Sequence, residues 1–339
     1  MSDFRIDKIT NRDGSAGTQI CGVSTFSGTS GMQLPVGPTE YRGGRGRGVF
    51  AGGNKVPAYT NTMEYVTIAT TGNGTDFGDI SVAKNYVAGS ASATRGLISG
   101  GFTGSYISTI DYATVSSLGG ASDFGDLTIA KYSITGLSDS VRGFVVGGDL
   151  SPNVNQSKIE FNIFASTGNA SDFGDLMKPR RSTYACASPT RGIVAAGYNA
   201  PADVAIIEKF TMATKGNTTQ FGNLIYAARD GVGASNSTRG MFSAGVLASG
   251  AATNIIQYIT ISSDGDAVDF GDLTIIRYSV GGFASSTRAA VAGGYVHPAA
   301  QNVIDYATIA TTGNAVDFGD MTEVKYGLCG FSDVHGGLG

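Results

Sequence analysis

The hydrophobic and polar positions of this 339-residue chain follow a pattern that repeats about every 48 residues. One unit, beginning at Arg288, holds four short segments: an apolar run that ends in Gly-Gly, a β-branched and aromatic stretch at 303–309, a short segment at 317–320 and a stretch at 321–328. Gly and Asn lie between the segments and tolerate the positive φ of tight turns. The pattern predicts short β-strands with no helix between them.

Two markers define the repeat. The phenylalanine of a DFGD-like phrase recurs at spacings of 47, 49, 48, 49 and 48 residues, at Phe77, Phe124, Phe173, Phe221, Phe270 and Phe318. An arginine precedes a short apolar run that ends in glycine, at Arg47, Arg95, Arg142, Arg191, Arg239 and Arg288. Two markers with one period indicate one structural unit that is present six times.

Four short antiparallel strands in about 48 residues are typical of a β-propeller blade. We expect an all-β fold, a six-bladed β-propeller over residues 46–339, with the C-terminal strand pairing with the inner strand RGVFAGG at 47–53. Such a closure removes two exposed sheet edges. A parallel β-solenoid is the alternative fold, and seven blades would require strands from the N-terminal segment.

The glycine doublets, and a Tyr placed before a basic strand, resemble the kelch repeat over residues 47–334. The kelch signature also expects a tryptophan, and this chain has none. The phenylalanine of DFGD would take over its packing role. The phrase SDFGDLT is similar to the Asp-box of sialidases, which would also end in tryptophan.

Composition limits the class of protein. The chain is 41% hydrophobic and 15% charged, which predicts a globular protein that buries both faces of most strands. A net charge of −4 argues against nucleic-acid binding. Cys21, Cys186 and Cys329 are far apart, so they are expected to be reduced thiols. The absence of a long apolar run or signal peptide predicts cytoplasmic synthesis without membrane insertion.

Residues 1–45 do not follow the repeat and are expected to form an extended N-terminal arm. They are rich in Gly, Ser and Thr but carry apolar residues at intervals, at Ile20, Val23, Phe26, Met32 and Leu34. A simple flexible linker would not need these side chains. The arm is expected either to lie on its own propeller or to anchor the chain to another protein by strand addition or groove filling.

TNRDGSAG near the N-terminus, GVSTFSGTSGMQLPVGPTEYRGGRGRGVFAGG and units such as IDYATIATTGNAVDFGDMT resemble virion structural proteins of tailed bacteriophages, notably cyanophages and other marine phages. The resemblance covers the whole chain. It implies a tail, baseplate or capsid-surface component that is present in multiple copies, contacts other virion proteins and leaves the host by lysis.

Charged residues recur with the repeat. Two acids flank Phe-Gly, and a base follows the phenylalanine by seven residues, at Lys84, Lys131, Arg180, Arg277 and Lys325. The fourth unit loses both kinds together, with Gln220, Asn223 and Ala228 at these positions. The acids are therefore expected to pair with the bases or to cap turns. A calcium site at 264–272 is the functional alternative.

No catalytic residue, cofactor or metal is expected, because the only histidines, His297 and His335, lie in no catalytic motif. The six repeated arginines would form a ring near one mouth, held by Asp or strand carbonyls, or would attract an anionic ligand. Unit-specific loops at 149–156, 198–203 and 296–301 are the expected binding segments. The alternative function is a lectin for host surface glycans, with Tyr106, Tyr198 and Tyr295 as candidate sugar platforms at one mouth. A glycan-cleaving enzyme is the third hypothesis.

Overall fold

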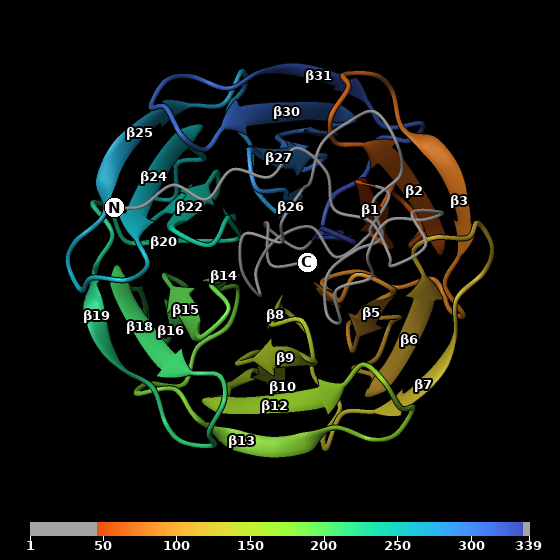
Figure 1. Ribbon diagram of the computed structural model, residues 1–339, viewed down its shortest axis with the longest axis horizontal. Coiled ribbons are helices and arrows are strands. Elements are labelled where there is room, and N and C mark those ends of the chain that lie inside the picture. The colour runs from red at the N-terminus through yellow and green to blue at the C-terminus, as the bar shows by residue number, and fades with distance from the viewer. Residues whose placement is uncertain (1–45, 335–339) are drawn as a thin grey trace, which may run out of the picture. The chain divides into compact units, whose positions relative to one another are not determined.

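The computed structural model describes residues 46–334, which contain β-strands and no helix. Six antiparallel four-stranded sheets surround a central axis in Figure 1, so the predicted all-β, six-bladed propeller is confirmed. The alternative fold, a parallel β-solenoid, is wrong for these residues. The arm at 1–45, with its five apolar residues, lies outside the described residues.

Each blade has four strands, which we name from the axis outward. The innermost strands are β4 (Ala88–Ala91), β8 (Thr135–Ser138), β14 (Tyr184–Ala187), β21 (Val232–Ser235), β26 (Gly281–Ala284) and β32 (Cys329–Ser332). The second strands are β1 (Arg47–Ala51), β5 (Arg95–Ser99), β9 (Arg142–Val146), β15 (Arg191–Ala195), β22 (Arg239–Ser243) and β27 (Arg288–Ala292). The third strands are β2 (Thr62–Thr67), β6 (Thr109–Thr114), β12 (Lys158–Ile163), β18 (Ile206–Thr211), β24 (Ile255–Thr260) and β30 (Val303–Thr308).

The outer strands, which carry the DFGD phrase, are β3 (Thr75–Asp79), β7 (Ser122–Asp126), β13 (Ser171–Asp175), β19 (Thr219–Asn223), β25 (Val268–Asp272) and β31 (Val316–Asp320). Short two-stranded pairs accompany the blades: β10 (Asp149–Leu150) with β11 (Val154–Asn155), β16 (Tyr198–Asn199) with β17 (Ala202–Asp203), β20 (Ala228–Arg229) with β23 (Val246–Leu247), and β28 (Tyr295–Val296) with β29 (Ala299–Ala300).

The ring closes between its last and first strands. β32 pairs with β1, and Cys329 lies opposite Ala51. Blade 1 is therefore β32-β1-β2-β3, and blades 2 to 6 follow along the chain. Two details of the sequence prediction are wrong. The run at 47–53 forms the second strand rather than the inner one, and the fourth strand begins at Cys329 rather than near 321, because residues 321–328 first have to reach the axis.

The DFGD phrase forms a β-bulge at the blade edge. In blade 1, Gly78 lies opposite Met63 and Asp76 opposite Glu64, so Phe77 is the extra residue between them. The same register shift occurs in every blade. It turns the six phenylalanines into the core, where each is at most 4% exposed. An extra residue of this kind bends the strand and increases its twist.

The glycine that follows the phenylalanine allows two blades to approach. Gly78 has φ of +137°, and a Cβ there would overlap the carbonyl oxygen of Gly119 in the next blade. The Gly119 amide also donates to the Phe77 carbonyl oxygen at 2.8 Å. The core itself lies between neighbouring blades, since Met63 of blade 1 clusters with Ile98 of blade 2.

The innermost strands are packed too closely for most side chains. A Cβ at Gly136 would overlap the carbonyl of Gly89, and one at Gly233 would overlap the carbonyl of Ala185. These strands are short and contain many Gly, Ala and Ser residues, as in AGSA and TGLS. The small residues are therefore a requirement of the crowded axis.

The inner strands also alternate, so that the ring has a two-blade period. The turn that precedes each repeated arginine is capped by serine in blades 2, 4 and 6 and by Asp or Asn in blades 1, 3 and 5: Ser92, Ser188 and Ser285, then Asp333, Asp139 and Asn236. Serine hydroxyls join the inner strands in pairs, with Ser138 donating to Ala91, Ser235 to Ala187 and Ser332 to Ala284. The ring therefore consists of three similar two-blade units.

Candidate functional site at one mouth of the ring

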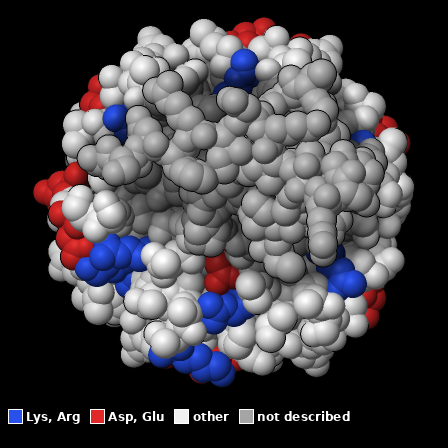
Figure 2. Space-filling view, viewed as in Figure 1, with Lys and Arg blue, Asp and Glu red and all other residues white. Residues whose placement is uncertain are grey.

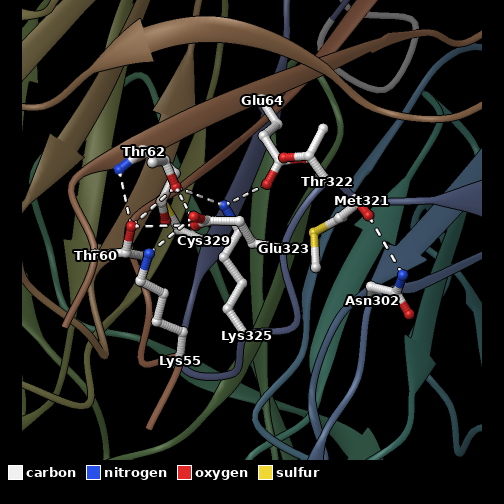
Figure 3. Close-up of polar contacts among 11 residues, drawn as sticks. Lys55, Thr60, Thr62, Glu64, Asn302, Met321, Thr322, Glu323, Lys325 and Cys329 are labelled. Carbon is white, nitrogen blue, oxygen red and sulfur yellow. Dashed lines mark hydrogen bonds and ion pairs between the residues drawn. The ribbon is translucent and has the colours of Figure 1, made fainter. Parts of the chain in front are cut away.

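Buried ion pairs join five of the six blade interfaces. The base that follows each DFGD phrase reaches an acid on the third strand of the next blade, in the pairs Lys84–Asp111, Lys131–Glu160, Arg180–Glu208, Arg277–Asp305 and Lys325–Glu64, at 2.6 to 3.0 Å. Figure 3 shows the pair at the ring closure, where the Lys325 ammonium contacts Glu64 and Thr62. These charges hold blades together and are not available to a ligand.

The partner acids differ from the predicted ones. The acids that flank Phe-Gly are mostly solvent-exposed, and none of them pairs with the five repeated bases. Asp126 and Asp175 instead accept hydrogen bonds from Ser108 and Ser157 at 2.9 and 2.8 Å. The expected pairing with DFGD acids is wrong because the base turns inward to the axis, away from the exposed edge of its own blade.

The interface between blades 4 and 5 lacks the buried ion pair of the other five, although Lys209 of blade 4 pairs with the exposed Asp264 of blade 5. Ala228 occupies the base position, and Gln257 occupies the acid position on β24. The Gln257 side-chain oxygen accepts a hydrogen bond from the Ile225 amide at 2.6 Å, just as Glu64 accepts one from the Thr322 amide. The base and the acid are therefore lost together, while the backbone contact is kept.

The six repeated arginines also join blades. Each donates a hydrogen bond to a carbonyl in the next blade, at Val115, Phe164, Ala213, Ile261, Ile309 and Ile68 in chain order. Four of the guanidinium groups also lie over a tyrosine ring, such as that of Arg288 over Tyr306 at 4.5 Å. On the uncovered part of the face shown in Figure 2, basic side chains lie at separate places around the ring.

The mouth of the ring on the side away from the six repeated arginines is less regular. The segments that enter the innermost strands and the loops that leave the second strands meet on this side, because neighbouring strands are antiparallel. Six residues with positive φ encircle the axis here, at Tyr86, Ser133, Ser182, Asp230, Ser279 and Gly327. The amides of all but Ser133 donate to a carbonyl of this same set, from 2.6 to 3.2 Å. We call this region the mouth.

Aromatic side chains follow one another around much of the mouth. Ring centroids 4.7 to 6.5 Å apart connect Tyr59, Phe102, Tyr106, Tyr132, Tyr86, Tyr326, Tyr295 and Tyr278. We call these eight residues the aromatic arc. Burial raises the pKa of Tyr106, Tyr278 and Tyr326 above the ordinary value of 10.0. Their hydroxyls are protonated at neutral pH, as tyrosine hydroxyls ordinarily are, and can donate hydrogen bonds.

Charged residues occupy the other side of the mouth. Arg181 donates to Asp149 at 2.8 Å, and Arg229 donates to Asp203 at 2.6 Å while its Nε lies 3.6 Å from Asp230. Burial raises the pKa of the Asp149 and Asp230 carboxyls despite these arginines. We call these five residues the charged cluster. It breaks the symmetry of the ring, because the positions equivalent to Arg181 and Arg229 are Asn85, Tyr132, Tyr278 and Tyr326.

A cavity of about 360 Å³ lies where the two sets meet. Its walls include Tyr86, Tyr132, Arg181, Tyr198, Arg229 and Asp230. Three tyrosines and five polar or charged residues line it, and its volume lies at the lower end of the range of about 300 to 1,000 Å³ that small-ligand sites span. The mouth can therefore offer ring faces, hydroxyl donors and carboxylate acceptors to one ligand.

The three tyrosines chosen from the sequence all lie at this mouth, but their surroundings differ. Tyr106 stacks on Tyr132 at 4.7 Å, and Tyr295 lies edge-on to Tyr326 at 5.0 Å. The guanidinium groups of Arg181 and Arg229 lie over the Tyr198 ring at 5.0 and 5.7 Å, so this ring contacts protein cations. Sequence analysis missed Tyr86, Tyr278 and Tyr326, whose signal was their place directly after the repeated base or one residue later.

The remaining candidate chemistry is dispersed. Within residues 46–334, no group of three or more His, Cys, Asp or Glu side chains is arranged to hold a metal ion. In the proposed calcium segment, Asp264 pairs with Lys209, and Asp266 accepts from the Asn223 amide. His297 is exposed beside Tyr295, Cys186 and Cys329 are buried free thiols, and Cys21 and His335 lie outside the described residues.

Among residues 46–334 there is no helix that is long and apolar enough to cross a membrane. No protein-family model matches the chain, and no curated protein matches it.

Proposed function

We propose that the chain is a non-catalytic structural component of a tailed-phage particle, present in multiple copies in the tail, baseplate or capsid surface. The observation that supports this role is the use of repeated charges. Five ion pairs and six arginine-to-carbonyl contacts join successive blades. Such a ring is a rigid body suited to assembly. The resemblance of the repeat phrases to phage virion proteins is the reason for proposing a phage particle as the assembly.

In this proposal, the arm at 1–45 anchors the ring to a neighbouring virion protein through Ile20, Val23, Phe26, Met32 and Leu34. The protein is made in the host cytoplasm and ends in the virion. Deleting residues 1–40 should leave a folded ring that fails to enter particles, measured by the chain's abundance in purified virions. A second test variant keeps the full length of the chain and replaces the five apolar residues with serine, and it should also fail to enter particles. Normal incorporation of either variant would contradict the anchoring role.

A second function, binding of host-surface glycans, is favoured by the aromatic arc. Eight connected aromatic side chains lie around one mouth of the ring. Tyrosine offers an apolar ring face together with a hydroxyl donor, which suits the mixed surface of a sugar. The two functions are compatible, since a particle component can also contact the host.

A further inference from the structure

The charged cluster contains residues that other blades do not carry at the equivalent positions. At the residue that follows the base position, only the segments entering β14 and β21 carry arginine, and Asp230 is the only acid among the six positive-φ residues of the mouth. The buried ion pairs recur at five of the six blade interfaces, and the arginine-to-carbonyl contacts recur at all six. Residues that occur once, around a cavity, are better explained by binding than by folding.

The positive charges of this cluster are already matched. Arg181 and Arg229 each form a hydrogen-bonded ion pair with an aspartate, Asp149 and Asp203, whose side chains are 0% and 3% exposed. Arg229 also faces Asp230. Three carboxyl groups therefore accompany two guanidinium groups. An anionic ligand would meet no unpaired positive charge here and would approach an excess of carboxyl groups.

Hydrogen-bond acceptors are in excess at the same place. The second carboxylate oxygens of Asp149 and Asp203 are buried without a donor among the described residues. The Asp230 side chain is 20% exposed and lines the cavity. Among these three carboxyls, Asp230 is the one that lines the cavity, so a ligand with several hydroxyl donors can supply a hydrogen bond to it.

We propose that the mouth binds an uncharged glycan, with one sugar ring against the tyrosines of the aromatic arc and its hydroxyl groups donating to Asp230 and accepting from Arg181 and Arg229. This inference deepens the glycan-binding function and rests on it. The cavity of about 360 Å³ adjoins both surfaces at once. The sugar's C–H face packs on an aromatic ring, and its hydroxyls pair with the charged cluster, so both kinds of group are satisfied.

The test uses the full chain on a glycan array that carries neutral, carboxylated, sulfated and amino-sugar glycans. The best neutral glycan is then titrated by calorimetry against three variants. Asp230→Asn keeps the size of the side chain and tolerates positive φ, and Tyr132→Ala removes a ring of the arc that lines the cavity. Each should weaken binding at least about tenfold, the loss expected for a hydrogen bond to a charged group or for a stacking ring. The exposed Tyr226, outside the cavity, gives the matched control Tyr226→Ala, which should bind as the parent does.

The outcomes separate the two ideas. Preference for neutral glycans, weakened by Asp230→Asn and Tyr132→Ala but not by Tyr226→Ala, supports the inference. Binding restricted to acidic or amino-sugar glycans overturns the neutral specificity and leaves glycan binding intact. Neutral binding that neither mouth variant changes, while thermal melting shows both folded, places the site elsewhere and overturns the inference. No binding to any glycan removes the glycan function itself.

Discussion

Lys131 and Glu160 illustrate how single side chains hold this ring together. Their charged atoms are 2.6 Å apart, and both side chains are completely buried. Glu160 also accepts a hydrogen bond from the Thr128 amide. Burial lowers the pKa of the Lys131 ammonium, which shows that the pair carries a desolvation cost. Since Ala228 and Gln257 occupy these two positions at another interface, the fold does not need the charges themselves.

This comparison gives a sharp prediction. Lys131→Ala should destabilise the protein by about 3 to 5 kcal/mol, because it leaves the Glu160 carboxylate buried without its partner. The double variant Lys131→Ala/Glu160→Gln should recover most of that loss, since glutamine keeps the contact to Thr128. Unfolding by guanidinium chloride measures both variants and the single Glu160→Gln. Equal losses in the two Lys131 variants would show that the lysine acts by packing alone.

Asp230 gives a pH-dependent prediction. Burial raises the pKa of its carboxyl in the folded protein above the ordinary value of 3.8, so the folded state holds this proton to a higher pH than the unfolded state does. Its contribution to stability therefore falls as pH rises from about 3.8 through the folded pKa. Asp230→Asn cannot lose a proton, so it should melt at a higher temperature than the parent at neutral pH and lose that advantage in acid. Melting curves across pH measure the difference, and a variant that is less stable at every pH would contradict the prediction.

At the scale of elements, the sequence predicts the outer three strands of a blade, but it does not predict the innermost strand. The stretch at 303–309 contains β-branched and aromatic residues and forms β30, and the segment at 317–320 lies in β31. The innermost strands have sequences such as CGFS and VGAS, with little strand propensity. Their conformation is imposed by crowding at the axis, so it depends on blades that sequence propensity does not see.

The two-blade period shows what the sequence does contain. The capping residues Ser92, Asp139, Ser188 and Asn236 alternate in kind along the chain. That alternation has a period of two units, and a comparison of odd with even repeats would have found it. The ion-pair partners could not be found in this way. The DFGD acids and the acids of the third strands both recur with the step of about 48 residues. Only the three-dimensional path of residues 80–87 and their equivalents decides which of the two kinds of acid pairs with the base.

At the scale of the whole molecule, the mouth is a product of closure. Tyr86 and Tyr326 are 240 residues apart in sequence, yet their ring centroids are 6.5 Å apart because blades 1 and 2 are neighbours in the ring. Of the loops expected to bind, those at 149–156 and 198–203 contribute Asp149, Tyr198 and Asp203 to the mouth, and the loop at 296–301 directly follows Tyr295. Their meeting with the base-following residues required the blade order and could not be predicted from loop sequences alone.

The closed ring, on which the interfaces and the mouth depend, is tested most directly by a cross-link at the seam. Ala51→Cys places a second thiol opposite Cys329. Burial raises the pKa of the Cys329 thiol to about 12, so an added oxidant is needed. Ser243→Cys, at the equivalent position of β22, pairs with Val232 and serves as the control. Peptide mass spectrometry of oxidised monomer should find position 51 joined to Cys329 within one chain, and no link from position 243 to Cys329. A link that forms only between two chains, or none at all when both thiols react after unfolding, would contradict the closed ring.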